Sequence, residues 1–423
     1  MSVLEELGRR GFINQVTDPD LGKILAREKM IFYAGFDPTA DSLHIGNLLV
    51  MMGMVHLQRA GHKPIGVVGG GTGMIGDPSG KAKERQLLSR QEIARNMQGI
   101  KAQMQHFLQF GKSGSEVMMV NNSDWLEKLN LVEFLRDTGK HFRLGEMINR
   151  ESVRARMESE EGISFTEFCY QLLQAYDFYH LCREYDCRLQ VGGSDQWGNI
   201  TAGIDLIRAK LQKPAYGLTF PLVTTAGGAK FGKTEQGTIW LDANRTSQYQ
   251  FYQYWIQVDD RDVVQYLKYF TLLPLEEIAE LAERVKKEPE KREAQRRLAF
   301  EVTAMTHGKN SAQQAENASR LLFGEKLENL SDAELVMVFD QAPSYELAKA
   351  DLEKGINLVD LLFQAKAFPS KAEAKRKIKE GGVYLNNQRM ADLEYRLRIQ
   401  DLASEHFLVL RVGKKNYHLI RVN

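Results

Sequence analysis

The first half of the chain alternates short apolar segments with stretches of helical periodicity, and several apolar segments end in glycine. The strand-like segments are 31–36, 63–70, 116–122 and 187–193, and residues 83–108 carry helical periodicity. Such alternation is typical of an open parallel sheet covered by helices. Glycine lets a ligand approach the backbone, and these sheets bind ligands at the carboxyl ends of their strands. The sequence therefore predicts an α/β domain with its site at that edge.

The predicted domain organisation follows from where this alternation stops. We expect a Rossmann-like α/β domain over 1–236, interrupted at about 123–170 by a mostly helical insertion. After residue 237 the strand pattern fades, and 237–330 is predicted to be an α-helical domain. Residues 331–350 are expected to be a linker with weak helical content, followed by a small α+β domain over 351–423.

The charge of the chain is unevenly distributed. Lys and Arg total 56 and Asp and Glu total 55, which gives a net charge of +1. That balance excludes a uniformly basic nucleic-acid coat and an acidic disordered chain. Residues 351–423 nevertheless hold 14 basic and 9 acidic side chains, so a basic C-terminal segment follows a mildly acidic body.

The three cysteines, Cys169, Cys182 and Cys187, include no C-x-x-C pair. This pattern argues against a disulfide scaffold and a tetrahedral zinc site, and favours reduced thiols. The longest apolar run, 48–55, is far shorter than the roughly 20 residues that cross a membrane. We therefore expect a cytoplasmic protein without a dedicated metal site.

Two glycine motifs are incomplete nucleotide signatures. Residues 71–76 fit G-x-G-x-x-G after a strand, but 83–108 is helical where a second strand with an acidic end should follow. Gly80 and Lys81 resemble the end of a phosphate-binding loop, but Ala82 stands where Ser or Thr should bind magnesium. Neither motif predicts a classical dinucleotide or P-loop site.

A stronger signal is His44-Ile45-Gly46-Asn47 at the start of a predicted helix, just after the first strand. Backbone N–H groups at a helix N-terminus attract phosphate. His44 and Asn47 lie one helical turn apart and can both donate to it, and Gly46 allows a flat base to stack on the backbone. Taken alone, the segment is equally compatible with a helix start carrying incidental polar residues.

The second signal is Lys230-Phe231-Gly232-Lys233-Thr234, preceded by two glycines. Two lysines and a hydroxyl in a glycine-flanked loop, predicted to be mobile, suit stabilisation of a polyphosphate leaving group in the transition state. Taken alone, a solvated basic turn is the simpler interpretation.

Together, the two motifs resemble the signatures of class I aminoacyl-tRNA synthetases. Residues 33–39, 76–79, 170–177 and 192–199 are similar to segments of the bacterial tyrosyl-tRNA synthetases, and 351–423 resembles their S4-like RNA-binding domain. The resemblance covers nearly the whole chain.

The resemblance implies a tyrosine–tRNA ligase, which joins L-tyrosine and ATP into tyrosyl-adenylate and pyrophosphate. Tyrosine then passes to the 3′-terminal adenosine of tRNA(Tyr). It also implies that Mg²⁺ accompanies ATP, that 237–330 lies on the anticodon side of the tRNA, and that the protein is a homodimer, with 123–170 as the candidate interface. No enzyme nucleophile is needed, because positioning and charge stabilisation serve an in-line displacement.

By the same resemblance, Tyr33 and Asp177 hold the phenol of tyrosine. A buried polar pair rejects an analogue that lacks the hydroxyl, a rule for which this type of enzyme is the standard example. Tyr170, Gln174 and Asp177 lie at i, i+4 and i+7 on one helical stripe, which favours a pocket lining over a solvated helix face. The resemblance assigns Tyr170, Gln174 and Asp77, with Gln190 nearby, to the substrate ammonium; Gly35, Asp37, Thr39, His44, Gly46, Asn47, Gly192, Asp195, Gln196 and Lys233 to ATP; and Thr39, His44, Asn47, Lys81, Arg85, Lys230, Lys233 and Thr234 to the catalytic handling of the phosphates.

The chain departs from the general class pattern in both motifs. Asn47 stands where the class has a second histidine, so this side chain can donate a hydrogen bond but cannot carry charge. Phe231, Gly232 and Thr234 replace Met, Ser and Ser, while both lysines are present.

The C-terminal segment has a basic stripe of its own. Lys371, Lys375 and Lys379 recur every four residues on one helix face with Arg376 alongside, and Arg411, Lys414 and Lys415 add charge later. Such a stripe suits RNA phosphates, although a lone stripe is more often a solvated face.

Three other interpretations remain. A tryptophan-specific sister enzyme is opposed by the Tyr33 and Asp177 pair, since indole has no use for a buried carboxylate at the end of its ring. A small nucleotidyltransferase is opposed by chain length and the basic C-terminal segment. A non-catalytic RNA-binding paralogue is opposed by the presence of His44, Lys230 and Lys233.

Overall fold

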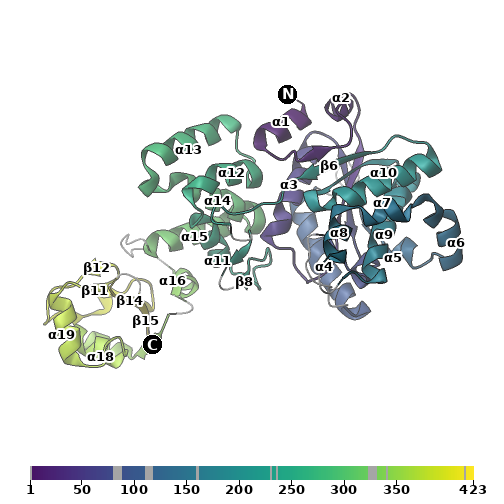
Figure 1. Cartoon of the computed structure of the whole chain (residues 1–423). Coiled ribbons are helices and arrows are strands. Elements are labelled where there is room, and N and C mark those ends of the chain that lie inside the picture. Colours follow the sequence, from purple (N-terminus) through teal and green to yellow (C-terminus); the bar gives the residue numbers. More distant parts are fainter. Residues whose placement is uncertain are drawn as a thin grey trace. The chain divides into compact units, whose positions relative to one another are not determined.

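In the computed structural model of the protein, a six-stranded sheet organises the N-terminal part of the chain (Figure 1). Five strands run parallel, and β1 alone is antiparallel to its neighbour β6. The structure confirms the predicted parallel sheet, although sequence analysis missed the strands β1 and β6. The order across the sheet is β1 (Gln15–Val16), β6 (Tyr216–Phe220), β5 (Cys187–Gly193), β2 (Ile31–Phe36), β3 (Lys63–Val68) and β4 (Met118–Asn121).

The described residues are grouped into two units. Unit 1 comprises 1–247 and 256–298, and unit 2 comprises 248–255 and 299–423. Within the described part of the chain, no helix combines the length and apolar composition that a membrane crossing requires. The structure describes residues 2–79, 88–109, 118–158, 162–228, 231–234, 237–322, 331–339, 342–413 and 416–423.

Helices cover both faces of the sheet in unit 1. Tyr33, Ile65 and Val67 pack with residues of α9 (Phe165–Tyr185) and α10 (Trp197–Leu211) in one hydrophobic core. On the other face, α4 (Arg90–Phe107) lies so close to β3 that a Cβ on Gly66 would be 2.3 Å from the methyl carbon of Met104. Alternating side chains of a strand point to opposite faces, which accounts for the strongly apolar sequence of β3.

A switch point lies between β2 and β5, where the connections diverge. β2 leads through α3 (Ile45–Arg59) to β3, and β5 leads through α10 to β6 on its other side. Crossovers that leave in opposite directions open a crevice at the carboxyl ends of the two strands. This edge is where the sequence predicted the site.

One buried arginine joins the N-terminal helix to the helical end of unit 1. Arg10, the last residue of α1 (Val3–Arg10), donates to the carbonyl oxygens of Lys268, Thr271 and Leu273 at 3.4, 3.3 and 2.8 Å. These carbonyls lie in and after the last turn of a helix, where intrahelical donors are missing. The neighbouring helices are α2 (Leu21–Arg27), α12 (Asp260–Phe270) and α13 (Leu275–Lys287).

Short helices fill the interval between β4 and α9, where the sequence predicted a helical insertion. A buried ion pair joins the last of them to α9, with Arg156 Nη2 2.7 Å from Glu167 Oε2. Several large apolar side chains are exposed here, including Leu131 and Leu144. The helices are α5 (Ser123–Leu126), α6 (Leu131–Asp137), η2 (Gly139–His141), α7 (Leu144–Ile148) and α8 (Glu151–Met157).

Unit 2 contains a second, mostly antiparallel sheet of five strands. Its order is β12 (Gln388–Arg389), β11 (Val383–Leu385), β14 (Phe407–Val412), β15 (Asn416–Val422) and β9 (Ser344–Leu347). Leu347, Leu358, Ile378 and Leu410 belong to its core, shared with α18 (Leu358–Gln364) and α19 (Lys371–Lys379). The other helices and strands named in this region are α11 (Gln248–Ile256), α14 (Glu293–His307), α15 (Lys309–Leu322), α16 (Asp332–Phe339), α17 (Lys349–Glu353), β10 (Ile356–Asn357) and β13 (Arg396–Leu397).

The segment expected to be a linker, 331–350, instead contributes to this small fold. β9 pairs in parallel with β15, with Tyr345 opposite Ile420. α16 contributes Leu335 and Phe339 to a core with Phe407 and other residues. The weak pattern of 331–350 misled the prediction because a short edge strand and a helix of eight residues carry little periodicity.

Candidate active site

Polar side chains from several strand ends meet at the carboxyl edge of the parallel sheet. Tyr170 Oη and Thr72 Oγ1 donate to the two carboxylate oxygens of Asp37 at 2.9 and 2.8 Å. Asn122 Nδ2 donates to Thr72 Oγ1 at 2.9 Å and to Asp177 Oδ2 at 3.0 Å. Asp37 follows β2, Thr72 follows β3 and Asn122 follows β4, so the network joins three strand ends to α9.

Asp177 is the buried acid at the end of this network, with 3% of its surface exposed. Trp125 Nε1 donates to its Oδ1 at 2.7 Å, while Asn122 serves the other oxygen. Burial raises the pKa of the Asp177 carboxyl to about 7, although these two hydrogen bonds act in the opposite direction. The carboxyl is therefore close to its midpoint of ionisation at neutral pH.

The hydroxyl of Tyr33 is a buried polar group without a hydrogen-bond partner among the described residues. Its ring packs against Phe178, with centroids 5.3 Å apart. Burial, with the nearby Asp177 charge second, raises the pKa of Tyr33 well above its usual value, so the hydroxyl is neutral. Leaving such a group unpaired is costly, and this points to a ligand that supplies the missing partner.

A second polar cluster gathers residues from the β3 loop, α9 and the start of α10. Gln196 Nε2 donates to Asp77 Oδ2 at 2.7 Å, and Gln174 Nε2 donates to Gln196 Oε1 at 3.1 Å. Asn199 Nδ2 donates to Gln174 Oε1 at 3.0 Å. The structure thus brings together three predicted site residues, and Gln190 Oε1 is a further buried oxygen without a partner in the described part of the chain.

The first motif forms the N-terminus of α3, as expected. His44 is the N-cap residue, and its backbone N–H donates to Asn47 Oδ1 at 3.1 Å. Because the amide oxygen faces the backbone, the NH2 is the end of Asn47 that can donate to an anion. A Cβ on Gly46 would lie 2.7 Å from His44 Cε1, so glycine lets the imidazole lie against the backbone.

The two motifs, far apart in sequence, are joined by backbone hydrogen bonds. Ile45 N donates to Ile239 O at 3.1 Å, and Ile239 N donates to Gly232 O at 3.0 Å. Gly232 has a φ of +79°, and a Cβ there would lie 2.9 Å from Ile45 Cγ1. Phe231 anchors the segment by stacking on Phe270 at 5.3 Å.

Several predicted phosphate ligands can be located only in part. Lys81, Arg85 and Lys230 lie outside the described residues. Lys233 and Thr234 form β7 (Lys233–Thr234), which pairs with β8 (Gly237–Thr238); only their backbone is described.

The remaining predicted ATP residues lie at the same strand ends. Gly35 belongs to β2, and a Cβ there would meet nothing within 4 Å. Thr39 N donates to Asp37 O at 2.8 Å in the turn that follows β2. Gly192 is the last residue but one of β5 and lies beside Gln196, and Asp195 lies in η3 (Ser194–Gln196).

Family models cover almost the entire chain. The model for class I tRNA synthetases of tryptophan and tyrosine matches residues 25–324, and the model for the C-terminal domain of tyrosine–tRNA ligases matches 334–420. The tyrosine–tRNA ligase of Roseiflexus castenholzii is 51% identical over 422 residues, covering 100% of this chain and 99% of that one. Tyrosine–tRNA ligase 1 of Bacillus subtilis is 50% identical, covering 99% of each chain.

The chain belongs to the tyrosine–tRNA ligase family. A C-terminally truncated mitochondrial tyrosyl-tRNA synthetase from Aspergillus nidulans has a similar fold, with a TM-score of 0.68 and 35% identity over 76% of this chain and 94% of that one. The comparisons confirm the family that the motifs indicated.

In this member of the tyrosine–tRNA ligase family, the structure places in the site several residues that sequence analysis missed. Thr72, Asn122 and Trp125 donate hydrogen bonds to Asp37 or Asp177, and Ser79 N donates to Asp77 Oδ1 at 2.9 Å. Asn122 could have been found, because it is the last residue of a predicted strand at the edge that carries the site. Trp125 had no comparable signal.

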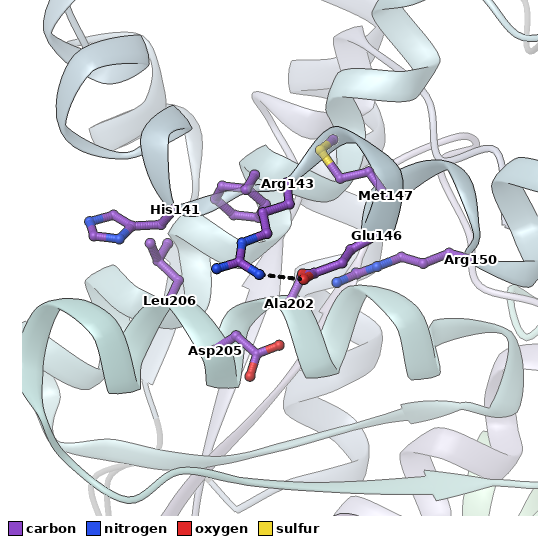
Figure 2. A pocket seen from close by; sticks show the side chains of 9 residues that line it. His141, Arg143, Glu146, Met147, Arg150, Ala202, Asp205 and Leu206 are labelled. Carbon is purple, nitrogen blue, oxygen red and sulfur yellow. Dashed lines mark ion pairs between the residues drawn. The ribbon is translucent and has the colours of Figure 1, made fainter.

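A pocket outside this edge is lined by other residues (Figure 2). Arg143 and Glu146 of the insertion form an ion pair at 3.6 Å there, close to Asp205 of α10. None of the predicted site residues lines this pocket.

The predicted basic stripe lies on α19 in unit 2. Lys371, Lys375, Arg376 and Lys379 are all exposed. Lys371 Nζ is 2.7 Å from Asp360 Oδ1, and Arg376 is near Glu373 and Glu380 at 3.7 and 3.8 Å. Arg411 stacks instead on a tyrosine ring, with its Cζ 3.8 Å from the centroid of Tyr384, and Lys414 and Lys415 lie outside the described residues.

Replacing Asp177 with Asn should remove a pH dependence from the stability of the ligand-free protein. The pKa of about 7 lies above the usual 3.8, so wild type is progressively destabilised as pH rises from about 4 to 7. Relative to Asp177→Asn, the free energy of unfolding of wild type should fall by about 2 kcal/mol between pH 5.5 and 8, as measured by urea unfolding.

The control is Asp205→Asn, which removes an exposed carboxylate paired with Arg208. It should show no such pH dependence. A stability difference for Asp177→Asn that does not change with pH would contradict the buried-acid assignment.

Proposed function

We propose that this chain activates L-tyrosine with ATP to form tyrosyl-adenylate and pyrophosphate, and then transfers tyrosine to the 3′-terminal adenosine of tRNA(Tyr). Membership of the tyrosine–tRNA ligase family supports the reaction and ATP as a substrate. The observation that carries the amino-acid specificity is the buried pair of Tyr33 and Asp177, whose polar atoms suit a phenol.

In this proposal the phenol of tyrosine donates to Asp177 and accepts from the Tyr33 hydroxyl. The phenol thereby supplies the partner that Tyr33 lacks, and gives the carboxylate a third donor beside Asn122 and Trp125. Phenylalanine has the same ring but would leave both groups unpaired, which is costly in a buried site.

The substrate ammonium would bind in the second polar cluster. Asp77 supplies the carboxylate, Gln174 supplies an amide oxygen, and the phenol oxygen of Tyr170 lies next to Asp37. Gln190 Oε1 is a further buried oxygen that has no hydrogen-bond partner among the described residues. Acceptors predominate in this set, as a cationic group requires.

ATP would bind between the ends of β2 and β5, with its phosphates at the N-terminus of α3. His44, Asn47 and the backbone N–H groups of the first helical turn can donate to phosphate oxygens. The tyrosine carboxylate attacks the α-phosphorus while the α–β bridging bond to pyrophosphate breaks. Lys81, Arg85, Lys230, Lys233 and Thr234 are proposed to stabilise the charge on the departing pyrophosphate.

Mg²⁺ is proposed to enter with the nucleotide rather than through a protein cage. Both carboxylate oxygens of Asp37 already accept hydrogen bonds from protein groups, and one Asp77 oxygen accepts from Gln196. Phosphate oxygens and water would therefore supply most of the octahedral ligands, as is common for this ion. The metal would neutralise phosphate charge.

We propose that residues 1–236 carry out catalysis, that residues 237–330 lie on the anticodon side of the tRNA, and that the C-terminal fold binds RNA. The exposed lysines of α19 support the last assignment, since Lys375 and Lys379 enter none of the ion pairs described for this helix. The cytoplasmic location stays a prediction.

A homodimer is proposed through residues 123–170, which comprise the helices between β4 and α9 and the start of α9. Leu131, Val132, Leu144 and Phe165 are 70, 72, 61 and 79% exposed within this one segment. Large apolar side chains concentrated on one region mark an interaction surface. The occupant we propose is the same surface of a second copy, because two-fold self-association is the commonest oligomer.

The decisive measurement is ATP–pyrophosphate exchange with each of the twenty amino acids. Exchange should depend on tyrosine, and its absence with tyrosine would refute the proposed function. Tyr33→Phe should lower the preference for tyrosine over phenylalanine in kcat/KM by about threefold to tenfold, the usual worth of one hydrogen bond. The control is Tyr216→Phe, because Tyr216 is the first residue of β6 and lies at the end of that strand opposite to the carboxyl edge. This variant should leave the preference for tyrosine over phenylalanine unchanged.

A charge placed on the exposed apolar surface should dissociate the dimer. Leu131→Glu should give the mass of a single 48.2 kDa chain in sedimentation equilibrium at concentrations where wild type has twice that mass. Leu222→Glu, which alters an exposed leucine outside this surface, is the control. A wild-type monomer, or dimers of equal strength in both variants, would rule out this interface.

Removing the unpaired lysines of α19 should weaken RNA binding alone. For the double variant Lys375→Ala, Lys379→Ala, we expect unchanged pyrophosphate exchange and a raised KM for tRNA. The plot of the logarithm of the tRNA binding constant against the logarithm of salt concentration should have a slope smaller in magnitude by about one to two. The control carries Lys349→Ala and Lys354→Ala in the same unit. Identical tRNA binding by both variants would exclude α19 from the RNA surface.

A further inference from the structure

A cluster of three side chains lies beside the paired backbone of the two phosphate motifs, and neither motif includes it. The Cζ of Arg245 lies 4.6 Å from the ring centroid of Trp240. Arg245 Nε is 2.5 Å from Asp41 Oδ1, an ion pair by proximity rather than an aligned hydrogen bond. Asp41, Trp240 and Arg245 are called the latch below.

The latch joins the segment that precedes α3 to the segment that follows the second motif. His44 and Trp240 form an antiparallel bridge, and Leu241 N donates to Leu43 O at 2.9 Å. Asp41 lies three residues before His44, in the segment that precedes α3. Arg245 lies four residues after Leu241, in the segment that follows the second motif. The side chains therefore close the same junction that the backbone hydrogen bonds form.

Further polar contacts hold both segments at this junction. Gln103 Oε1 accepts from Leu43 N at 2.7 Å, and Gln103 Nε2 donates to Ser42 Oγ at 2.9 Å. Ser42 Oγ also accepts from Asp242 N at 3.2 Å. Trp240 N donates to Thr246 Oγ1 at 3.0 Å, so the side chains of the latch reinforce a junction that other polar contacts also hold.

Trp240 is also in contact with the ring of the first-motif histidine. The centroids of His44 and Trp240 are 6.0 Å apart, in an edge-on arrangement at 60°. On another side, His44 Cε1 would be 2.7 Å from a Cβ on Gly46, so the backbone of α3 limits the ring there. The orientation of the imidazole therefore depends on where the Trp240 ring is held.

We propose that Trp240, held by Arg245 and Asp41, is a positioning residue for the phosphate chemistry. It fixes the His44 ring and keeps the returning strand of the second motif against the first. This inference rests on the proposed function, because it assigns the latch to the adenylate-forming step. A donor contributes most to catalysis when its direction is set before charge develops on the phosphates.

The latch should act on the transition state more than on substrate binding. Arg245 and Asp41 touch neither of the two polar clusters that are proposed to hold tyrosine, so tyrosine affinity should not depend on them. A loosened His44 would lose interaction energy mainly as charge moves toward pyrophosphate, which lowers kcat without raising KM.

The test uses the full-length protein and tyrosine-dependent ATP–pyrophosphate exchange. Arg245→Met should lower kcat by about threefold to tenfold, with the KM values for tyrosine and ATP within about twofold of wild type, because it removes a partly exposed cation–π contact and an ion pair. Arg245→Lys keeps the charge and should recover most of the rate. Trp240→Ala should lower kcat at least as much as Arg245→Met.

Arg284→Met is the matched control, because Arg284 Nη1 also lies 2.5 Å from a carboxylate oxygen, that of Glu293, in a partly exposed pair that joins two helices. Its kcat should equal that of wild type. Hydrogen exchange gives an independent readout, since amides of Ile239 and Leu241 should exchange faster in Arg245→Met than in Arg284→Met.

Equal kcat for Arg245→Met and Arg284→Met, or a loss confined to the KM for tyrosine, would overturn the proposal. Failure of the proposed function is distinguishable, since wild type itself would then show no tyrosine-dependent exchange.

Discussion

The burial of one carboxyl group organises the polar edge of the parallel sheet. Asp177 is placed among apolar side chains on α9, and its two oxygens are served by Trp125 and Asn122. Asn122 also binds Thr72, which binds Asp37, so strand ends that are distant in sequence are aligned with the same acid. Burial still holds the Asp177 pKa at about 7. Two hydrogen bonds therefore only partly offset the free energy that the carboxylate loses when it is removed from solvent.

In the proposed function, this incomplete compensation would make the site selective. A fully satisfied carboxylate would gain little from a ligand hydroxyl, whereas Asp177 and the unpaired Tyr33 both gain a partner from a phenol. Stability and selectivity are therefore opposed at these positions, because a side chain that suits the empty pocket better would remove the difference between tyrosine and phenylalanine. The cost is confined to these two groups because the surrounding polar residues have partners of their own: Tyr170 donates to Asp37, and Asn122 donates to Thr72.

The sequence predicted the parallel sheet and its functional edge because both follow from local patterns. Strand ends rich in glycine and the helical spacing of Tyr170, Gln174 and Asp177 depend on short stretches of chain. The sequence did not predict the contact between Trp125 and Asp177, or the pairing of Ile45 with Ile239, because these are tertiary contacts that leave no periodicity. Residues 331–350 show the same limit, since the strand Ser344–Leu347 is defined by its pairing with β15 rather than by its own four residues.

The residues proposed to select the amino acid and those proposed to bind the phosphates are held in place by different parts of the fold, and the two parts meet at one residue. The polar network at Asp177 rests on α9 and the ends of β3 and β4, while the phosphate motifs rest on α3 and the segment Ile239–Leu241. Asp37 belongs to both: its carboxylate accepts from Tyr170 and Thr72, and its carbonyl accepts from Thr39 N in the turn that leads to His44. A change at Asp37 would therefore disturb both functions together, whereas changes at Asp177 or in the latch separate them. Positions that are coupled through a shared residue are expected to be non-additive, and positions on opposite sides of it are expected to be additive.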